Sequence, residues 1–397
     1  MDFDQVIAPL GRDGFLTGHW EKSWLHLPGP PDRFSDLLSW DELGAILENT
    51  RMAPPHIRLS KDGHLIEPER YMHTPPGPGH LPHIDSGRLT ALLADGATLV
   101  LQGVEDLAPK VRALSESFRD ALKARNHVNL YAGWHSQNGF DLHWDTHEVM
   151  VLQLHGRKRW QIFAPTQDYP LDTGTPPKPE GAPLWDGILN TGEVLYLPRG
   201  WWHVAHPLNE PSMHLTFGIA PMHGVNLLNW MVKRLRSHAH LRRNLPVLRE
   251  SAARQAHMVE LRALVAEALD DKAIDDFLRE ADGFVHGHPP IRLPQAPYDQ
   301  AAPLRDKSLI RLASSPRLAL TVQDGKAVFN AYDKTYHVPV QVKPALEMLN
   351  DRQAVSLAEL YTALDGEAAV ASLRKGLAML ARAGVVVVEQ SDAEPGP

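Results

Sequence analysis

The chain has 397 residues, of which 43% are hydrophobic and 22% charged, values typical of a folded globular protein with more than one domain. Its formal charge of −8 disfavours nucleic acid and anionic membranes as partners, because an acidic chain gains no general attraction to phosphate. The absence of cysteine excludes disulfides and thiolate metal ligands, and with no basic apolar leader and no apolar stretch of about 18 residues we predict a cytoplasmic location.

The first half of the chain changes its hydrophobic period at residue 126. Residues 1–125 combine helical patterns at 39–49 and 110–123 with proline-rich turns, and we predict a helical, loop-rich lead-in that packs on the core. Residues 126–221 contain short segments with a strand pattern, namely HVNLYAGW, EVMVLQLHG, KRWQIFAP, EVLYLP and MHLTFGI. Many short strands at close spacing predict a β-sandwich or barrel.

The second half of the chain returns to helical patterns. Residues 222–285 are predicted helices, too few to enclose a core of their own, so we expect them to pack on the barrel, on each other or on a second subunit. Residues 286–306 form a proline-rich linker. In residues 307–391 a strand pair, three helices and a last strand follow in the order of a winged helix, and residues 392–397 are predicted to be a disordered tail.

Two His-x-Asp triplets are candidate metal ligands, His83 with Asp85 and His143 with Asp145. The second lies where the strand pattern is strong, and residues two apart on a strand project from the same face, so both side chains can reach one ion. The first lies between a turn-rich segment and a helical pattern. We predict that it has a structural or helix-capping role.

A third ligand is predicted at His203, in the segment EVLYLPRGWWHVAHP, where a turn can return the chain antiparallel to the first strand. Two histidines and one carboxylate form the facial triad of non-haem iron(II), which leaves open positions for a chelating co-substrate and oxygen. The alternatives are that His143 and His203 are ordinary half-buried histidines, or that another histidine binds the metal. The rival ligands are His147, His155, His206 and His214.

Lys158 is the candidate cation for the co-substrate. On the predicted strand KRWQIF it shares one face with Trp160 and Ile162. A dicarboxylic co-substrate such as 2-oxoglutarate needs such a cation, because its distal carboxylate would otherwise be desolvated without a partner. Asn129 and Tyr131 share a face of the preceding strand and offer an amide and a phenol to the same ligand. The alternative is that Lys158 belongs to a solvated strand edge.

Several blocks of this sequence resemble the ribosomal-oxygenase branch of the JmjC proteins. They are FLTGHWEKSWLHLPG, NLY, SQNGFDLHWDTHEVMVLQLHGRKRW and GEVLYLPRGWWH, which occur in the family's order and spacing. The resemblance covers nearly the whole chain and implies a mixed β and α fold: a double-stranded β-helix (the cupin or JmjC jelly roll) at 126–221, a helical dimerisation region at 222–285 and a winged helix at 307–391. Trp144 and the proline-rich segment 170–186 depart from the family pattern.

The resemblance also implies a set of site residues. For iron(II) it implies the ligands His143, Asp145 and His203. For 2-oxoglutarate it implies a carboxylate-binding Lys158 supported by Asn129 and Tyr131. Some relatives have arginine at the position of Lys158, and either cation serves this purpose.

The resemblance implies a dioxygenase that uses O2 and 2-oxoglutarate to hydroxylate a protein side chain, with an Arg or His of a ribosomal protein as the target and a homodimer as the assembly. Two alternatives stay open: the same chemistry on a peptide natural product or another protein, and a non-catalytic metal-binding cupin regulator. DNA binding by the winged helix is not expected, because residues 305–397 contain eleven Lys and Arg against eleven Asp and Glu.

Overall fold

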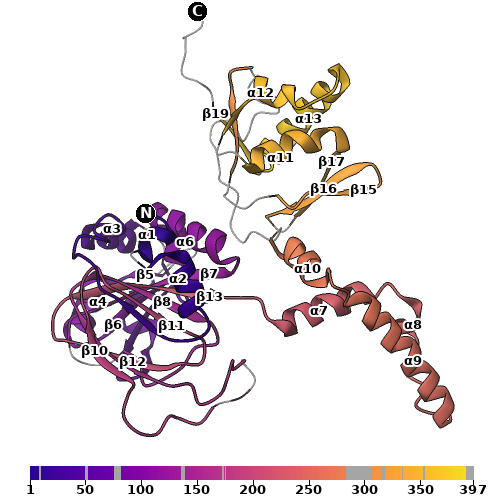
Figure 1. Ribbon diagram of the computed structural model, residues 1–397. Coiled ribbons are helices and arrows are strands. Elements are labelled where there is room, and N and C mark those ends of the chain that lie inside the picture. The colour runs from indigo at the N-terminus through magenta and orange to yellow at the C-terminus, as the bar shows by residue number, and fades with distance from the viewer. Residues whose placement is uncertain are drawn as a thin grey trace, which may run out of the picture. The chain divides into compact units, whose positions relative to one another are not determined.

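The computed structural model describes residues 1–8, 10–49, 52–75, 82–135, 139–171, 174, 176–282, 306–313, 318–332, 334–351 and 354–389 (Figure 1). The predicted linker, up to residue 305, and the predicted tail lie outside these residues. The chain divides into two compact units, residues 1–221 and 222–397. Among the described helices, none is both long and apolar enough to cross a bilayer.

An eight-stranded antiparallel sheet is the centre of the first unit. Its strands in spatial order are β1 (Leu25–Leu27), β11 (Val194–Leu197), β8 (Glu148–His155), β13 (Ser212–Ala220), β7 (Arg125–Gly133), β6 (Thr98–Gln102), β2 (Ile57–Lys61) and β3 (His64–Ile66). The segments predicted as strands thus form β7, β8, β11 and β13. The lead-in adds β1, β2, β3 and β6, which the sequence pattern did not predict.

A smaller antiparallel sheet packs against this one. It consists of β10 (Trp185–Leu189), β9 (Lys158–Phe163) and β12 (Trp202–Pro207). One hydrophobic cluster joins the two sheets, with Val151 and Leu195 from the large sheet against Trp160 and Ile162 from the small one. The central strand β8 is buried along nearly its whole length, which explains its uninterrupted apolar sequence. The two sheets form the predicted cupin core.

Helices cover the opposite face of the large sheet (Figure 1). They are α1 (Phe3–Val6), α2 (Gly11–Gly18), α3 (Trp40–Asn49), α4 (Ser86–Ala94), α5 (Val104–Leu107) and α6 (Pro109–Leu122). Helix α6 starts at a proline, which lacks the N–H that a first turn leaves unpaired, and buries Val111, Leu114 and Phe118. The ring of Phe118 stacks on Phe217 of β13 at 4.4 Å between centroids.

The first His-x-Asp triplet lies on this side of the unit, at the end of the short pair β4 (Met72–His73) and β5 (His83–Ile84). The Asp85 carboxylate accepts a hydrogen bond from the backbone N–H of Arg88 and caps helix α4. The predicted capping role is confirmed, because this carboxylate accepts a hydrogen bond from a backbone N–H that the first turn of the helix leaves unpaired.

The second unit begins with α7 (Gly224–Leu235), α8 (Ala239–Arg242), α9 (Ser251–Ala268) and α10 (Ala273–Asp282), as the helical pattern predicts. Its remaining elements are β14 (Leu309–Leu312), β15 (Thr321–Gln323), β16 (Lys326–Ala331), β17 (Lys334–Pro339), α11 (Lys343–Asp351), β18 (Val355–Ser356), α12 (Leu357–Thr362), α13 (Glu367–Arg382) and β19 (Val386–Glu389). Asp324 and Gly325 both have positive φ, which suits the tight turn of the β15–β16 hairpin. The last elements enclose their own hydrophobic core.

Candidate metal and co-substrate site

The structure brings His143, Asp145 and His203 together in the first unit. Their ligand atoms all lie within 4.8 Å of one another, and His203 Nε2 is 3.4 Å from Asp145 Oδ2. His143 precedes β8 and His203 belongs to β12, and the two backbones pair as an isolated antiparallel bridge. His143 N–H donates to His203 O at 3.2 Å, and His203 N–H donates to His143 O at 2.8 Å. The predicted return of the chain past the turn is therefore confirmed. The predicted strand at His143 and Asp145 is wrong, because both residues lie in the connection between β7 and β8.

The hydrogen bonds of both imidazoles prepare them for a metal. Nδ1 of His143 lies 2.8 Å from the backbone oxygen of Asp141, and Nδ1 of His203 lies 3.0 Å from that of Trp201. A carbonyl oxygen only accepts, so Nδ1 carries the proton in each ring and donates it. In the neutral rings Nε2 keeps its lone pair, which is the protonation state that a metal ligand needs.

The charges at the triad also fit a divalent cation. Burial, together with the neighbouring His143, lowers the pKa of His203 to about 4, so its ring is neutral at physiological pH. Burial raises the pKa of Asp145, but the imidazoles of His203 and His143 outweigh it and hold that pKa below its usual value. Two neutral nitrogens and one anionic oxygen are the donor set of a non-haem iron(II) site.

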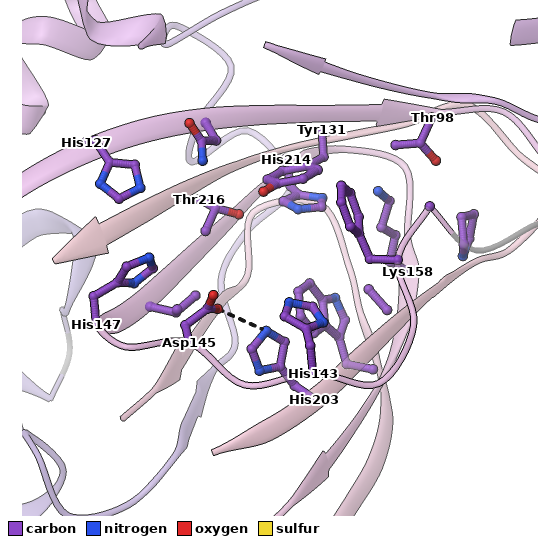
Figure 2. Close-up of a pocket in the computed structure, with 17 residues that line it drawn as sticks. Thr98, His127, Tyr131, His143, Asp145, His147, Lys158, His203, His214 and Thr216 are labelled. Atoms are coloured by element: carbon purple, nitrogen blue, oxygen red, sulfur yellow. Dashed lines mark ion pairs between the residues drawn. The ribbon is translucent and has the colours of Figure 1, made fainter. Parts of the chain in front are cut away.

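The triad lines a cavity of about 260 Å³, whose inner end contains Lys158 (Figure 2). Strand β9 alternates as predicted, with Lys158, Trp160 and Ile162 buried and Arg159 exposed. Lys158 is only 3% exposed, and burial lowers the pKa of its ammonium to about 7. The alternative of a solvated strand edge is wrong for this lysine. An ammonium buried at this cost is expected to meet an anion.

Asn129 and Tyr131 line the same cavity, while Leu130 between them points into the hydrophobic core. Burial, with a further contribution from Asp145, raises the pKa of Tyr131 to about 12, so its hydroxyl stays protonated and can donate to an anion. All three side chains predicted to contact the co-substrate thus line one cavity.

Two further buried groups near Lys158 were not predicted as co-substrate contacts. Nδ1 of His214 and Nε1 of Trp160 have no hydrogen-bond partner among the described residues. His214 stacks on Tyr131 at 5.0 Å and is held neutral, because burial and then the Lys158 ammonium lower its pKa. Buried polar atoms without partners are costly, so both point to a polar ligand in the cavity. The strand period alone would have placed Trp160 beside Lys158.

The rival histidines fall into two groups. His155 lies against the ring of Trp40, and His206 lies 3.2 Å from the side-chain oxygen of Gln161, both away from the cavity. His147 and His214 line the cavity but do not join the ligand cluster. On the side of Asp145 away from Lys158, His147 and His127 form an edge-to-face pair at 5.1 Å (Figure 2).

Comparison with known proteins identifies relatives of this chain. Residues 106–227 match the model of the JmjC domain. The bifunctional lysine-specific demethylase and histidyl-hydroxylase NO66 of Drosophila mojavensis is 27% identical over 258 residues, covering 61% of this chain and 28% of that protein. Ribosomal oxygenase 1 of Gallus gallus is 28% identical over 222 residues, covering 54% and 36%. The chain thus spans about a third of the length of these relatives or less.

Solved structures of similar fold extend the likeness to most of the chain. The ribosomal oxygenase YcfD of Escherichia coli shares 19% identity, with a TM-score of 0.62, and the match covers 96% of this chain and 99% of that one. A second structure, of YcfD in complex with cobalt and 2-oxoglutarate, covers 95% and 98% with a TM-score of 0.59 and 19% identity. At 19% identity the match establishes the cupin fold, and it carries no further conclusion about this chain.

Proposed function

We propose that this chain, whose residues 106–227 match the JmjC domain, is an iron(II)- and 2-oxoglutarate-dependent oxygenase that hydroxylates a side chain of a protein. The observation that carries the proposal is a single cavity with a His-Asp-His cluster and, at its inner end, a lysine that is 3% exposed. One divalent metal and one dicarboxylic acid account for both features. An inert cupin would have no use for a desolvated ammonium.

In this proposal His143 Nε2, the Asp145 carboxylate and His203 Nε2 hold iron(II). Lys158 receives the distal carboxylate of 2-oxoglutarate. Four further polar residues that line the cavity orient the co-substrate: Asn129, Tyr131, Trp160 and His214. The backbone bridge between His143 and His203 holds the two segments together, and the Nδ1 hydrogen bonds orient both rings, so little conformational entropy is lost when the metal binds.

The bound iron and co-substrate together supply the activation of O2. Overall, 2-oxoglutarate, O2 and a C–H bond of the target give succinate, CO2 and an alcohol on the target. The role of the protein is to exclude water and to keep the co-substrate in one orientation. Trp160, Val149 and Phe140 line the cavity with apolar surface for this purpose.

The target is proposed to be a ribosomal protein. The names of the relatives support this, since they include a histidyl-hydroxylase and two ribosomal oxygenases. A protein target also agrees with a chain whose formal charge is −8, because ribosomal proteins are basic and are attracted to an acidic surface. The cytoplasmic location predicted from the sequence stays a prediction.

The second unit is proposed to contain a dimerisation region at 222–285 and a winged helix at 307–391. Helices α7 and α9 support the first part, because apolar side chains on them are exposed, including Val232 at 51% and Val259 at 64%. Such side chains are commonly covered by a second subunit. The strand and helix order of the last part supports the second.

Anaerobic calorimetry with Mn(II) and 2-oxoglutarate tests the proposed site, because Mn(II) occupies iron(II) sites without turnover. We expect 2-oxoglutarate to bind only after the metal, and Asp145→Ala to abolish metal binding. Asp85→Ala removes the carboxylate of the other His-x-Asp triplet and is the matched control, which should keep metal binding. Metal binding without 2-oxoglutarate binding would instead support the non-catalytic cupin.

The aerobic test of the reaction is succinate formation with ribosomal-protein fragments, followed by mass spectrometry of the fragments. A gain of one oxygen on a side chain, lost in Asp145→Ala, is the expected result. Succinate formation that no fragment stimulates would count against a ribosomal target while leaving the co-substrate assignment intact.

A further inference from the structure

The turn at residues 198–201, between β11 and β12, contacts two of the three proposed metal ligands. The backbone N–H of Gly200 donates a hydrogen bond to the backbone oxygen of Asp145 at 3.0 Å. The backbone oxygen of Trp201 accepts the hydrogen bond from Nδ1 of His203, also at 3.0 Å. The position of this turn therefore sets the backbone of one ligand and the ring orientation of another.

A buried carboxylate holds the 198–201 turn. Glu148 is the first residue of β8 and is only 1% exposed. Its Oε1 accepts a hydrogen bond from the backbone N–H of Arg199 at 3.3 Å. Its Oε2 accepts a hydrogen bond from the hydroxyl of Tyr196, a fully buried residue of β11. The Glu148 carboxylate thus joins the start of β8, three residues after Asp145, to the turn and to the strand that leads into it.

The lead-in segment contacts the other side of Tyr196. The Tyr196 hydroxyl accepts a hydrogen bond from the backbone N–H of Glu21 at 2.9 Å, so its own proton is directed to Glu148. The Tyr196 ring stacks on Trp20 at 6.0 Å between centroids and meets Phe15 edge to face at 4.9 Å. A continuous series of contacts therefore runs from the lead-in through Tyr196 and Glu148 to the turn.

Hydrophobic packing does not explain a carboxylate at this position. Burial raises the pKa of Glu148 to about 7, because the surrounding protein solvates the charge less well than water does. Residues 149–152, which follow it on β8, are apolar and buried. An apolar residue would suit the start of the strand as well, but it could not accept the hydrogen bonds from Arg199 and Tyr196. These two hydrogen bonds distinguish Glu148 from its apolar neighbours.

We propose that Glu148, held by Tyr196, is a positioning residue for the metal site, which fixes the 198–201 turn so that Asp145 and His203 keep their geometry. This proposal rests on the proposed oxygenase function, because it requires a metal at the triad. Glu148 is not among the described residues that line the cavity, so its effect on the metal passes through the turn.

The test compares Mn(II) binding by the full chain and by its variants in anaerobic calorimetry. Glu148→Met removes both acceptor oxygens and keeps the length of the side chain. It should weaken Mn(II) binding by about tenfold, as the loss of groups that orient metal ligands commonly does. Tyr196→Phe keeps the ring but removes the hydroxyl that holds Glu148, and should weaken binding by about threefold. Glu148→Gln keeps an oxygen that can accept from Arg199 and should retain most of the affinity.

Glu105→Met is the matched control. Glu105 is also a partly buried carboxylate that accepts a hydrogen bond from a backbone N–H, that of Val128 at 2.9 Å. Val128 belongs to β7, a strand that contributes no ligand to the triad. The control variant should lose stability in the same way as Glu148→Met but keep the Mn(II) affinity of the parent chain.

Two further measurements show whether the effect passes through the turn. In the metal-free protein, the N–H groups of Arg199 and Gly200 should exchange their hydrogens faster in Glu148→Met than in the parent chain. The electron paramagnetic resonance spectrum of bound Mn(II) should also change, because its zero-field splitting depends on the geometry of the ligands. A general loss of stability would speed exchange throughout the first unit and leave the spectrum of the bound ion as it is in the parent.

The outcomes distinguish this proposal from the proposed function. If the parent chain fails to bind Mn(II), both are overturned. If the parent binds Mn(II) and Glu148→Met binds it equally well, or if Glu105→Met loses as much affinity, only the positioning role of Glu148 is overturned. The same holds if Glu148→Gln binds no better than Glu148→Met. If Glu148→Met does not fold, Tyr196→Phe decides, and an unchanged affinity in that variant overturns the role.

Discussion

The two faces of the large sheet are built from the same strands but have opposite character. On β7 and β13 the residues that face the helices are apolar and fully buried: Val128, Leu130, Ala132, Met213, Leu215, Phe217 and Ile219. The alternate residues face the cavity and are polar: His127, Asn129, Tyr131, His214 and Thr216. Because side chains alternate along a strand, a backbone fixed by its core face holds the site residues in register. Stability and binding should therefore be separable by substitutions one residue apart.

The largest expected effect is on stability, and it tests the face of the large sheet that packs against the helices. Phe217→Ala removes a fully buried ring that stacks on Phe118, and we expect a loss of about 3 to 5 kcal/mol in the free energy of unfolding. The neighbouring variant Thr216→Val, on the cavity face, should change that free energy by less than about 1 kcal/mol. Urea unfolding followed by tryptophan fluorescence measures both. Equal losses would show that the two faces are not separable.

The next substitution is expected to raise the free energy of unfolding instead of lowering it, because burying the Lys158 ammonium destabilises the folded protein. Its pKa falls from 10.5 to about 7 in the folded protein, so folding disfavours the charged form. The cost is full below pH 7, and it shrinks as the pH rises toward 10.5, since the unfolded chain then also loses the proton. At about 1.4 kcal/mol per pH unit, Lys158→Met should stabilise the metal-free protein by about 3 kcal/mol at pH 8.

The same variant should fail to bind 2-oxoglutarate, which calorimetry measures under the anaerobic conditions described above. Arg159→Met, one residue along β9 on the exposed face, is the matched control and should keep binding. If Lys158→Met were less stable than the parent chain across this pH range, the assignment of Lys158 as a desolvated functional group would be wrong.

A third prediction concerns proton uptake at the inner end of the cavity. Above pH 7 most of the free protein has a neutral Lys158, but a dicarboxylate binds the ammonium. We expect 2-oxoglutarate to bind with uptake of about one proton at pH 8, and its affinity to fall by about tenfold per pH unit above 7. Calorimetry in buffers of different ionisation enthalpy measures the uptake. Lys158→Arg, which keeps its charge, should show neither effect.

Local pattern was sufficient to predict the parts of the site that lie on one strand. The period of two placed Lys158 with Trp160 on β9, and the turn-rich setting of His83 identified the capping triplet. The expectation that a strand carries His143 and Asp145 was wrong, because both lie in the connection before β8 and His143 is held by its bridge to His203. What the pattern could not predict depends on pairing between distant segments. The run Thr98–Gln102 is a strand because β7 and β2 flank it, and the His127–His147 pair exists because β13 inserts Gly218 between them.

The smallest expected effect tests whether a polar side chain on the cavity face of β13 contacts the co-substrate. His214→Phe keeps a ring to stack on Tyr131 but removes Nδ1, which has no partner among the described residues. If that nitrogen contacts 2-oxoglutarate, the variant should weaken binding by about 1 kcal/mol, or about fivefold, in calorimetry. Its thermal stability should stay equal or rise, because a buried unsatisfied polar atom has been replaced by carbon. Unchanged affinity would mean that His214 only packs against Tyr131 and does not contact 2-oxoglutarate.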